Sequence, residues 1–241
     1  MPRFFVSPED IEENSIKIAG DDARHIARSL RMAVGDSITV ADGEGGIFSC
    51  RLTHIRDELC ECEIISKKEP EENPRVTLFM GYPKGDKLEL VIQKAVELGA
   101  SRIVPFESSR CIRRPKAERE EKQTERLRKI AAEAAKQCGA DRLPELSRPI
   151  PFDRMLDEAA EADISLFCYE NEEHCFIEDA LSEVSPRSIS VIVGPEGGFS
   201  EDEAERAKSR GCISVSLGKR ILRCETAPLF AISIISAKFR I

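Results

Sequence analysis

Residues 193–200 have the composition of a ligand-binding turn. They read Val-Gly-Pro-Glu-Gly-Gly-Phe-Ser and follow an apolar run, residues 189–193, that is typical of a buried strand. Ser200, with Glu203 three residues later, has the pattern of a helix capping box, so the glycines lie on a predicted strand-to-helix turn. Ligands bind at such turns in α/β sheets, and glycine lets backbone N–H groups approach a ligand closely. The alternative is a tight turn without a ligand.

A second loop of this kind occupies residues 217–227 and reads Leu-Gly-Lys-Arg-Ile-Leu-Arg-Cys-Glu-Thr-Ala. It follows a short apolar strand, residues 213–217, and precedes a helix with Thr226 as the predicted N-cap and Pro228 in the first turn. A solvated turn would rarely interleave isoleucine and leucine with charged residues. We expect the two loops to follow neighbouring strands and to form two walls of one pocket.

Together the two loops resemble those of the RsmE family of 16S ribosomal RNA uridine N3-methyltransferases, which carry a GPEGG turn and, later in the chain, an LGxRILRxETA loop. The resemblance extends over essentially the whole chain. It includes residues 25–32, 84–87, 93–99, 134–139 and 142–145. Two positions depart from the family pattern. Ala140 replaces a usual arginine, for which Arg142 is a candidate substitute, and Cys224 replaces a usual threonine.

The resemblance implies S-adenosylmethionine as cofactor and a uridine of 16S ribosomal RNA as acceptor, in free RNA or in the assembled small subunit. The implied cofactor contacts are Gly194, Glu196, Gly198, Leu217, Gly218, Ile221 and Leu222.

The acceptor nitrogen requires separate chemistry. Uridine N3 is a poor nucleophile until its proton leaves, so a base or a charge-stabilising group is needed. Arg220 and Arg223 are candidates to stabilise the resulting anion, and Glu225 is a candidate base. Glu196 is a second candidate base, and Glu225 could instead stabilise a helix N-terminus.

Basic residues must supply any RNA affinity locally, because the whole chain has a net charge of −8. One cluster lies within residues 24–31, and a second contains Arg102, Arg110, Arg113, Arg114, Lys116 and Arg119. The predicted RNA contacts are Arg24, His25, Arg28, Arg31, Arg110 and Arg142. The alternative for each cluster is an ordinary solvated face.

The elements that must position these residues fall into two predicted domains. Residues 1–70 contain short strands and one helix, residues 21–32, a pattern that predicts a small β-barrel. The resemblance implies a PUA-like RNA-binding domain here. A charged, proline-containing linker, residues 67–74, follows. In residues 75–241 strands alternate with helices, which predicts an α/β domain with a parallel sheet. The resemblance implies a SPOUT domain with a trefoil knot, and a homodimer.

Several classes of protein are disfavoured. No apolar run approaches the ~18 residues of a membrane span, and the N-terminus lacks the apolar core of a signal peptide, so we expect a cytoplasmic protein with no membrane contact. Nine cysteines and three histidines show no metal-ligand spacing, so no metal site is predicted. A phosphate-binding transferase would need a Gly-Lys-Ser/Thr sequence after the glycines, which is absent. A non-catalytic RNA-binding protein with a vestigial cofactor pocket is the remaining alternative, and Ala140 is its only support.

Overall fold

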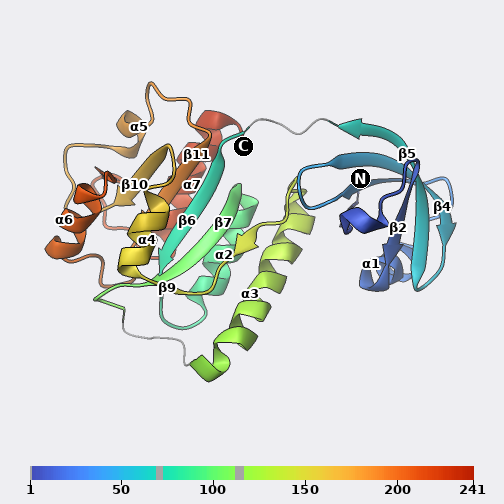
Figure 1. The fold of residues 1–241 in the computed structure, drawn as a ribbon, viewed down its shortest axis with the longest axis horizontal. Helices are drawn as coiled ribbons and strands as arrows, with labels where there is room; N and C mark the ends of the chain where they lie inside the picture. The colour runs from blue at the N-terminus through green and yellow to red at the C-terminus, as the bar shows by residue number, and fades with distance from the viewer. Residues whose placement is uncertain (1, 69–72, 112–116) are drawn as a thin grey trace. The chain divides into compact units, whose positions relative to one another are not determined.

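The computed structural model describes residues 2–68, 73–111 and 117–241, apart from the side chains of residues 117–119. The chain divides into two compact units (Figure 1). The first contains Met1–Glu72 and Ala135–Leu143, and the second contains Asn73–Ala134 and Pro144–Ile241. The sequence did not suggest that residues 135–143 would group with the first unit.

The first unit is built on a five-stranded curled sheet with the order β1-β3-β4-β5-β2. β1 runs parallel to β3, and the other pairs are antiparallel. The strands are β1 (Arg3–Phe5), β2 (Ser15–Ala19), β3 (Ser37–Ala41), β4 (Ile47–Ile55) and β5 (Leu59–Lys68). A short 3-10 helix, Pro8–Asp10, follows β1. Alternate strand residues such as Ile16, Ile18 and Ile38 are buried, because one face of the sheet covers the core.

The helix predicted for residues 21–32 is shorter and irregular. It consists of α1 (Gly20–Arg24) and a π-helical turn, His25–Ser29. Arg31 then adopts a left-handed backbone with φ 51°, and the N–H of Met32 returns to the carbonyl of Ile26 at 3.2 Å. This is how a helix end satisfies its last carbonyls, so the prediction that the helix continues to Met32 is wrong.

Residues 135–143 are held to the rest of the first unit by polar contacts. Lys136 Nζ lies 2.8 Å from Asp22 Oδ1, and Arg3 Nη1 lies 2.7 Å from Asp141 Oδ1. Arg142 donates to the carbonyl of Glu44. These long-range contacts explain why a segment distant in sequence belongs to the first unit.

The second unit contains a parallel sheet, as predicted. Its order is β12-β10-β11-β6-β7-β8, and β9 also pairs with β7. The strands are β6 (Arg75–Gly81), β7 (Ala100–Glu107), β8 (Glu145–Leu146), β9 (Ile150–Pro151), β10 (Ile164–Cys168), β11 (Ser188–Val193) and β12 (Ile213–Val215). Every pairing is parallel. β10 is buried along its whole length, as expected for a strand covered on both faces.

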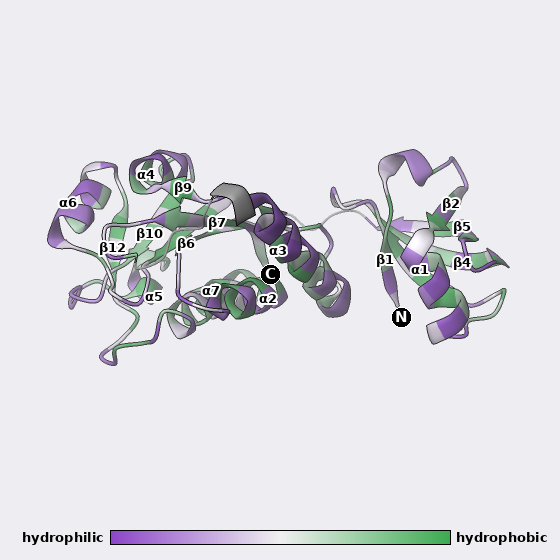
Figure 2. Cartoon of the chain, turned by 90° about the horizontal axis from the view of Figure 1, so that it is seen from below, coloured by the Kyte–Doolittle hydropathy of each residue, from purple (hydrophilic) through white to green (hydrophobic). Residues whose placement is uncertain are grey.

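Helices cover both faces of this sheet. α2, α5 and α7 lie on one face, and α4 and α6 lie on the other (Figure 2). The helices are α2 (Lys87–Glu97), α3 (Ala117–Cys138), α4 (Phe152–Ala159), α5 (Ile177–Ala180), α6 (Glu201–Ser209) and α7 (Thr226–Phe239). The sequence did not suggest α4, α5, β8 or β9. β8 and β9 have two residues each, too few to show a periodicity. No helix in the described ranges is both long enough and apolar enough to cross a lipid bilayer.

Candidate functional site

The two glycine-containing loops leave the same edge of the parallel sheet. The first follows β11 and the second follows β12, and parallel strands place their carboxyl ends together. The prediction that β11 and β12 are neighbours is wrong, because β10 pairs with both and lies between them. Both loops nevertheless reach one edge, which the segment after β6 also reaches.

The predicted capping box at Ser200 is confirmed. Ser200 Oγ accepts the N–H of Glu203 at 3.2 Å, and Glu203 Oε2 accepts the N–H of Ser200 at 2.9 Å. The other oxygen of Glu203 accepts the N–H of Ser109 at 2.8 Å. This buried carboxylate therefore ends the glycine turn and also fixes the loop after β7.

Gly198 occupies a position that no other residue fits without strain. Its φ is 62°, and a Cβ there would lie 1.8 Å from Glu170 Oε1. That oxygen accepts the N–H of Phe199 at 3.2 Å. The ring of Phe199 is buried, with its centroid 4.2 Å from that of Phe167. Gly194 is also confined, since a Cβ there would lie 3.1 Å from the Phe199 ring.

The second loop presents apolar and cationic side chains to solvent. Ile221 is 81% exposed, while Leu217 and Leu222 are half-buried. Gly218 has φ 110° with open space where a Cβ would be. An exposed isoleucine beside an open glycine offers an apolar surface and accessible backbone groups, which suits the adenine and ribose of a nucleoside cofactor.

Arg220 and Arg223 are exposed, and no ion pair joins either guanidinium to another residue in the described part of the chain. The backbone of Arg223 does accept hydrogen bonds, from the N–H groups of Thr226 and Ala227 at 2.8 and 3.0 Å. α7 begins at Thr226, so Glu225 is its N-cap residue, and the prediction that Thr226 is the N-cap is wrong. The two arginines are free to reach a ligand at this edge.

Lys87 joins the two loops, and the sequence did not single it out. Its Nζ lies 3.2 Å from Glu196 Oε1 in the first loop and 3.2 Å from Glu225 Oε2 in the second. It also donates to Cys224 Sγ at 3.7 Å. In the sequence, residues 84–87 stand out only through the family resemblance, and nothing local indicates which carboxylates Lys87 contacts.

Lys87, Glu196 and Glu225 form a cluster whose three side chains are charged near neutral pH. Hydrogen bonds to Glu225 and Glu196 raise the pKa of Lys87 to about 12. The backbone N–H of Glu225 holds the pKa of its own carboxyl below the ordinary value, with help from Cys224 and Lys87. Burial alone would raise the pKa of Glu196, but its own N–H, the N–H of Lys84 and Lys87 together lower it. Both carboxylates are therefore ionised, and a lowered pKa makes each a weaker base.

The predicted RNA contacts lie in both units. In the first unit, Arg24 pairs with Asp21 and Arg28 pairs with Asp57, while Arg31 is exposed. The His25 ring lies edge-on to Phe4, with centroids 6.4 Å apart. Arg142, in the same unit, contacts Glu44 as described above.

The second basic cluster is divided. Arg110 Nη1 donates to the carbonyl of Gly197 at 2.9 Å, so this residue lies beside the glycine turn. Arg102 pairs instead with Glu158 at 2.8 Å. Arg113, Arg114 and Lys116 fall outside the described residues, as does the side chain of Arg119.

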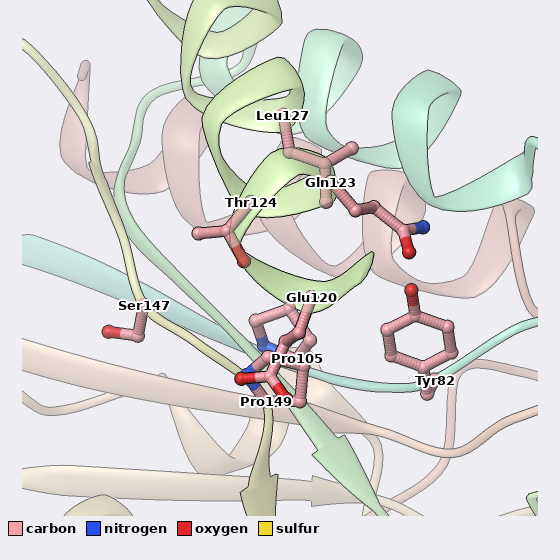
Figure 3. Close-up of a pocket in the computed structure, with 8 residues that line it drawn as sticks. All are labelled: Tyr82, Pro105, Glu120, Gln123, Thr124, Leu127, Ser147 and Pro149. Carbon is pink, nitrogen blue, oxygen red and sulfur yellow. The ribbon is translucent and has the colours of Figure 1, made fainter. Parts of the chain in front are cut away.

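A small cavity in the second unit is lined by other residues than those predicted for the site. It encloses about 220 Å³, open solvent included, between the first half of α3 and the segments around Pro105 and Pro149 (Figure 3). Tyr82, Gln123 and Thr124 line it, and none of the predicted cofactor or catalytic residues does. Within the described ranges no group of histidine, cysteine or acidic side chains is arranged to hold a metal ion.

Comparison with known proteins gives two family matches. Residues 70–236 match an RNA methyltransferase domain, and residues 18–68 match an RNA methyltransferase PUA domain. Ribosomal RNA small subunit methyltransferase E of Bacillus subtilis (strain 168) is 35% identical over 246 residues, which cover 98% of this chain and 96% of that protein.

Solved structures agree with these matches. Ribosomal RNA small subunit methyltransferase E from Neisseria gonorrhoeae, bound to S-adenosyl methionine, aligns with a TM-score of 0.83 and 32% identity, covering 99% of this chain and 98% of that chain. A putative methyltransferase from Legionella pneumophila, in complex with the same cofactor, aligns with a TM-score of 0.81 and 28% identity, covering 98% and 97%.

Proposed function

This chain belongs to the RsmE family of ribosomal RNA small subunit methyltransferases, and from that membership we propose that it methylates N3 of a uridine in 16S ribosomal RNA. It is an S-adenosylmethionine-dependent RNA methyltransferase with a PUA domain. The observation that carries the site assignment is the convergence of two glycine-containing loops, joined through Lys87, at the carboxyl edge of a parallel sheet.

S-adenosylmethionine, when bound, supplies a methyl group already activated by a sulfonium, so the chain needs no nucleophile of its own. Its task is to hold donor and acceptor in line. Gly218, with open space where a Cβ would be, lets the backbone approach the cofactor closely, and Leu217, Ile221 and Leu222 offer apolar contacts. Gly194 and Gly198 shape the first loop, because Phe199 and Glu170 fill the space beside them. Glu196 adds a carboxylate to the same wall.

The acceptor base needs its N3 proton removed or its anion stabilised. Arg220 and Arg223 are exposed cations at the edge, with no ion-pair partner among the described residues, and they suit negative charge developing on the uracil carbonyls. Glu225, held by Lys87, remains a candidate base, although its lowered pKa weakens it in that role. These catalytic and cofactor assignments are proposals.

The two units divide the work in this proposal. Residues 1–70 bind RNA, and residues 75–241 carry out methyl transfer. The second domain is proposed to be a SPOUT domain with a trefoil knot, in a homodimer. The knot and the dimer are proposed from the family membership alone.

A methylation assay tests the substrate. Small-subunit particles from cells lacking this protein, incubated with the purified enzyme and S-adenosylmethionine, should gain one methyl group at N3 of a uridine, identified by mass spectrometry of the digested nucleosides. Free 16S ribosomal RNA serves as the parallel substrate. A methyl group on another ring atom, or on another base, would refute the N3 assignment.

The segment carrying Arg28 and Arg31, at and just after the end of the π-helical turn, should contribute phosphate contacts. Arg28→Ala combined with Arg31→Asn, chosen because asparagine tolerates the left-handed backbone of residue 31, should weaken RNA binding and flatten its salt dependence. Each lost phosphate contact should reduce the slope of log affinity against log salt by about 0.7–0.9. Arg51→Ala, which removes a cation paired with Glu63 at 3.4 Å, is the control. If the slope of log affinity against log salt is unchanged in the double variant, Arg28 and Arg31 lie on an ordinary solvated surface that does not bind RNA.

A further inference from the structure

Lys87 is the first residue of α2, and its ammonium group lies between carboxylates from two loops that are distant in sequence. The first carboxylate, Glu196, also accepts the N–H of Lys84 at 3.0 Å. The second, Glu225, accepts the thiol of Cys224 at 3.3 Å. The beginning of α2 therefore holds both loops by polar contacts at their carboxylates.

We infer that Lys87 is a positioning residue for the cofactor site, which holds the Glu196 loop and the Glu225 loop in register by cancelling the repulsion between their carboxylates. This inference rests on the proposed function, because both loops are assigned to the cofactor. Lys87 acts through the two glutamates and need not touch the cofactor or the RNA.

The positions of the two carboxylates indicate that Lys87 acts through its positive charge. Each carboxylate oxygen lies 3.2 Å from the same nitrogen, so the two oxygens are at most twice that distance apart. Two ionised carboxylates so close repel each other unless a cation lies between them. The charged and titratable groups facing Lys87 are Glu225, Glu196 and Cys224, and the thiol of Cys224 has a pKa raised to about 12, mainly by burial. Lys87 is thus the cation that balances this cluster.

Removing the ammonium should therefore have a consequence that depends on pH. In Lys87→Met the two carboxylates face each other without a cation, which raises the pKa of one of them. Lowering the pH then protonates that carboxylate and removes the repulsion. The loops can approach again, and cofactor affinity recovers. The wild-type cluster lacks this response, because its carboxylates have lowered pKa values.

Calorimetry with S-adenosylmethionine tests the inference. Lys87→Met should bind the cofactor roughly tenfold more weakly than wild type near pH 8 and should regain most of the difference near pH 5. Wild type, titrated over the same range, corrects for ionisation of the cofactor itself. Lys87→Arg, which keeps the charge, should bind within about threefold of wild type.

A charge-matched double variant separates repulsion from lost packing. Lys87→Met with Glu225→Gln has the same net cluster charge as wild type and should recover cofactor affinity at pH 8 relative to Lys87→Met. Lys94→Met is the matched control, since Lys94 lies on the same helix and, among the described residues, forms its ion pair with Glu97 of that helix, at 2.8 Å. Its cofactor affinity should equal that of wild type.

Two results would overturn the inference: wild-type affinity in Lys87→Met, or a loss that neither low pH nor Glu225→Gln reduces. The second would mean that Lys87 acts only by packing. Failure of the proposed function would look different, because wild type itself would then bind no S-adenosylmethionine.

Discussion

Gly198→Val is expected to abolish binding of S-adenosylmethionine while the protein remains folded. The added side chain must displace the Glu170 carboxylate, which a Cβ would approach to 1.8 Å, and must adopt a backbone with φ 62°. Displacing Glu170 removes the acceptor for the N–H of Phe199 and disturbs the turn that should contact the cofactor. Calorimetric titration with the cofactor measures the loss, and circular dichroism with thermal melting checks the fold.

Two further variants separate the causes. Gly211→Ala also places a side chain on a left-handed backbone, with φ 83° and nothing within 4 Å of the Cβ, in the turn before β12. It should cost about 1–2 kcal/mol of stability and leave cofactor affinity unchanged. Gly198→Ala combined with Glu170→Ala should recover part of the affinity lost in Gly198→Ala. A folded Gly198→Val protein with wild-type affinity would remove this turn from the site.

Arg220→Ala and Arg223→Ala are each expected to lower kcat by roughly 10²-fold and to change cofactor affinity far less. Both guanidiniums are exposed and unpaired within the described residues, so either can stabilise charge on the acceptor base. Single-turnover rates and calorimetric affinities separate the two effects. Lys219→Ala is the control, because Lys219 is an exposed cation adjacent to Arg220. Equal loss in Lys219→Ala would indicate a general effect of loop charge on RNA binding.

Glu225→Ala distinguishes a base from a helix-end acid. If Glu225 takes the N3 proton, the variant should be slow, and its residual rate should rise with pH as uridine ionises without help. If Glu225 only stabilises the N-terminus of α7, the rate should be normal and stability should fall by about 0.3–1 kcal/mol. The pKa of Glu225 in the folded protein is below its ordinary value of 4.5. This stability difference is therefore fully present at neutral pH, begins to fall below pH 4.5, and is lost as the pH falls through the folded pKa. A normal rate at every pH would exclude Glu225 as the base.

Local patterns predicted much of the fold. The end of β11 at Val193 and the capping box at Ser200 were predicted residue by residue, because each depends on neighbours within a few positions. The alternation of strands and helices correctly predicted a parallel sheet. Errors occurred where tertiary contacts decide. The helix from residue 21 ends early at the left-handed Arg31, and residues 135–143 join the first unit through contacts such as Lys136 with Asp22.

By itself the sequence determined the family and the need for glycine at the turn, since motifs and backbone conformations are local properties. Only the tertiary structure decided which side chains meet. It placed β10 between β11 and β12, and among the residues that the structure describes it gave neither Arg220 nor Arg223 an ion-pair partner. It also brought the N–H of Lys84 to Glu196, 112 residues away, and Lys87 to Cys224, 137 residues away. Contacts between residues so distant leave no pattern of periodicity or spacing in the sequence. Which loops share an edge is decided only when the sheet folds.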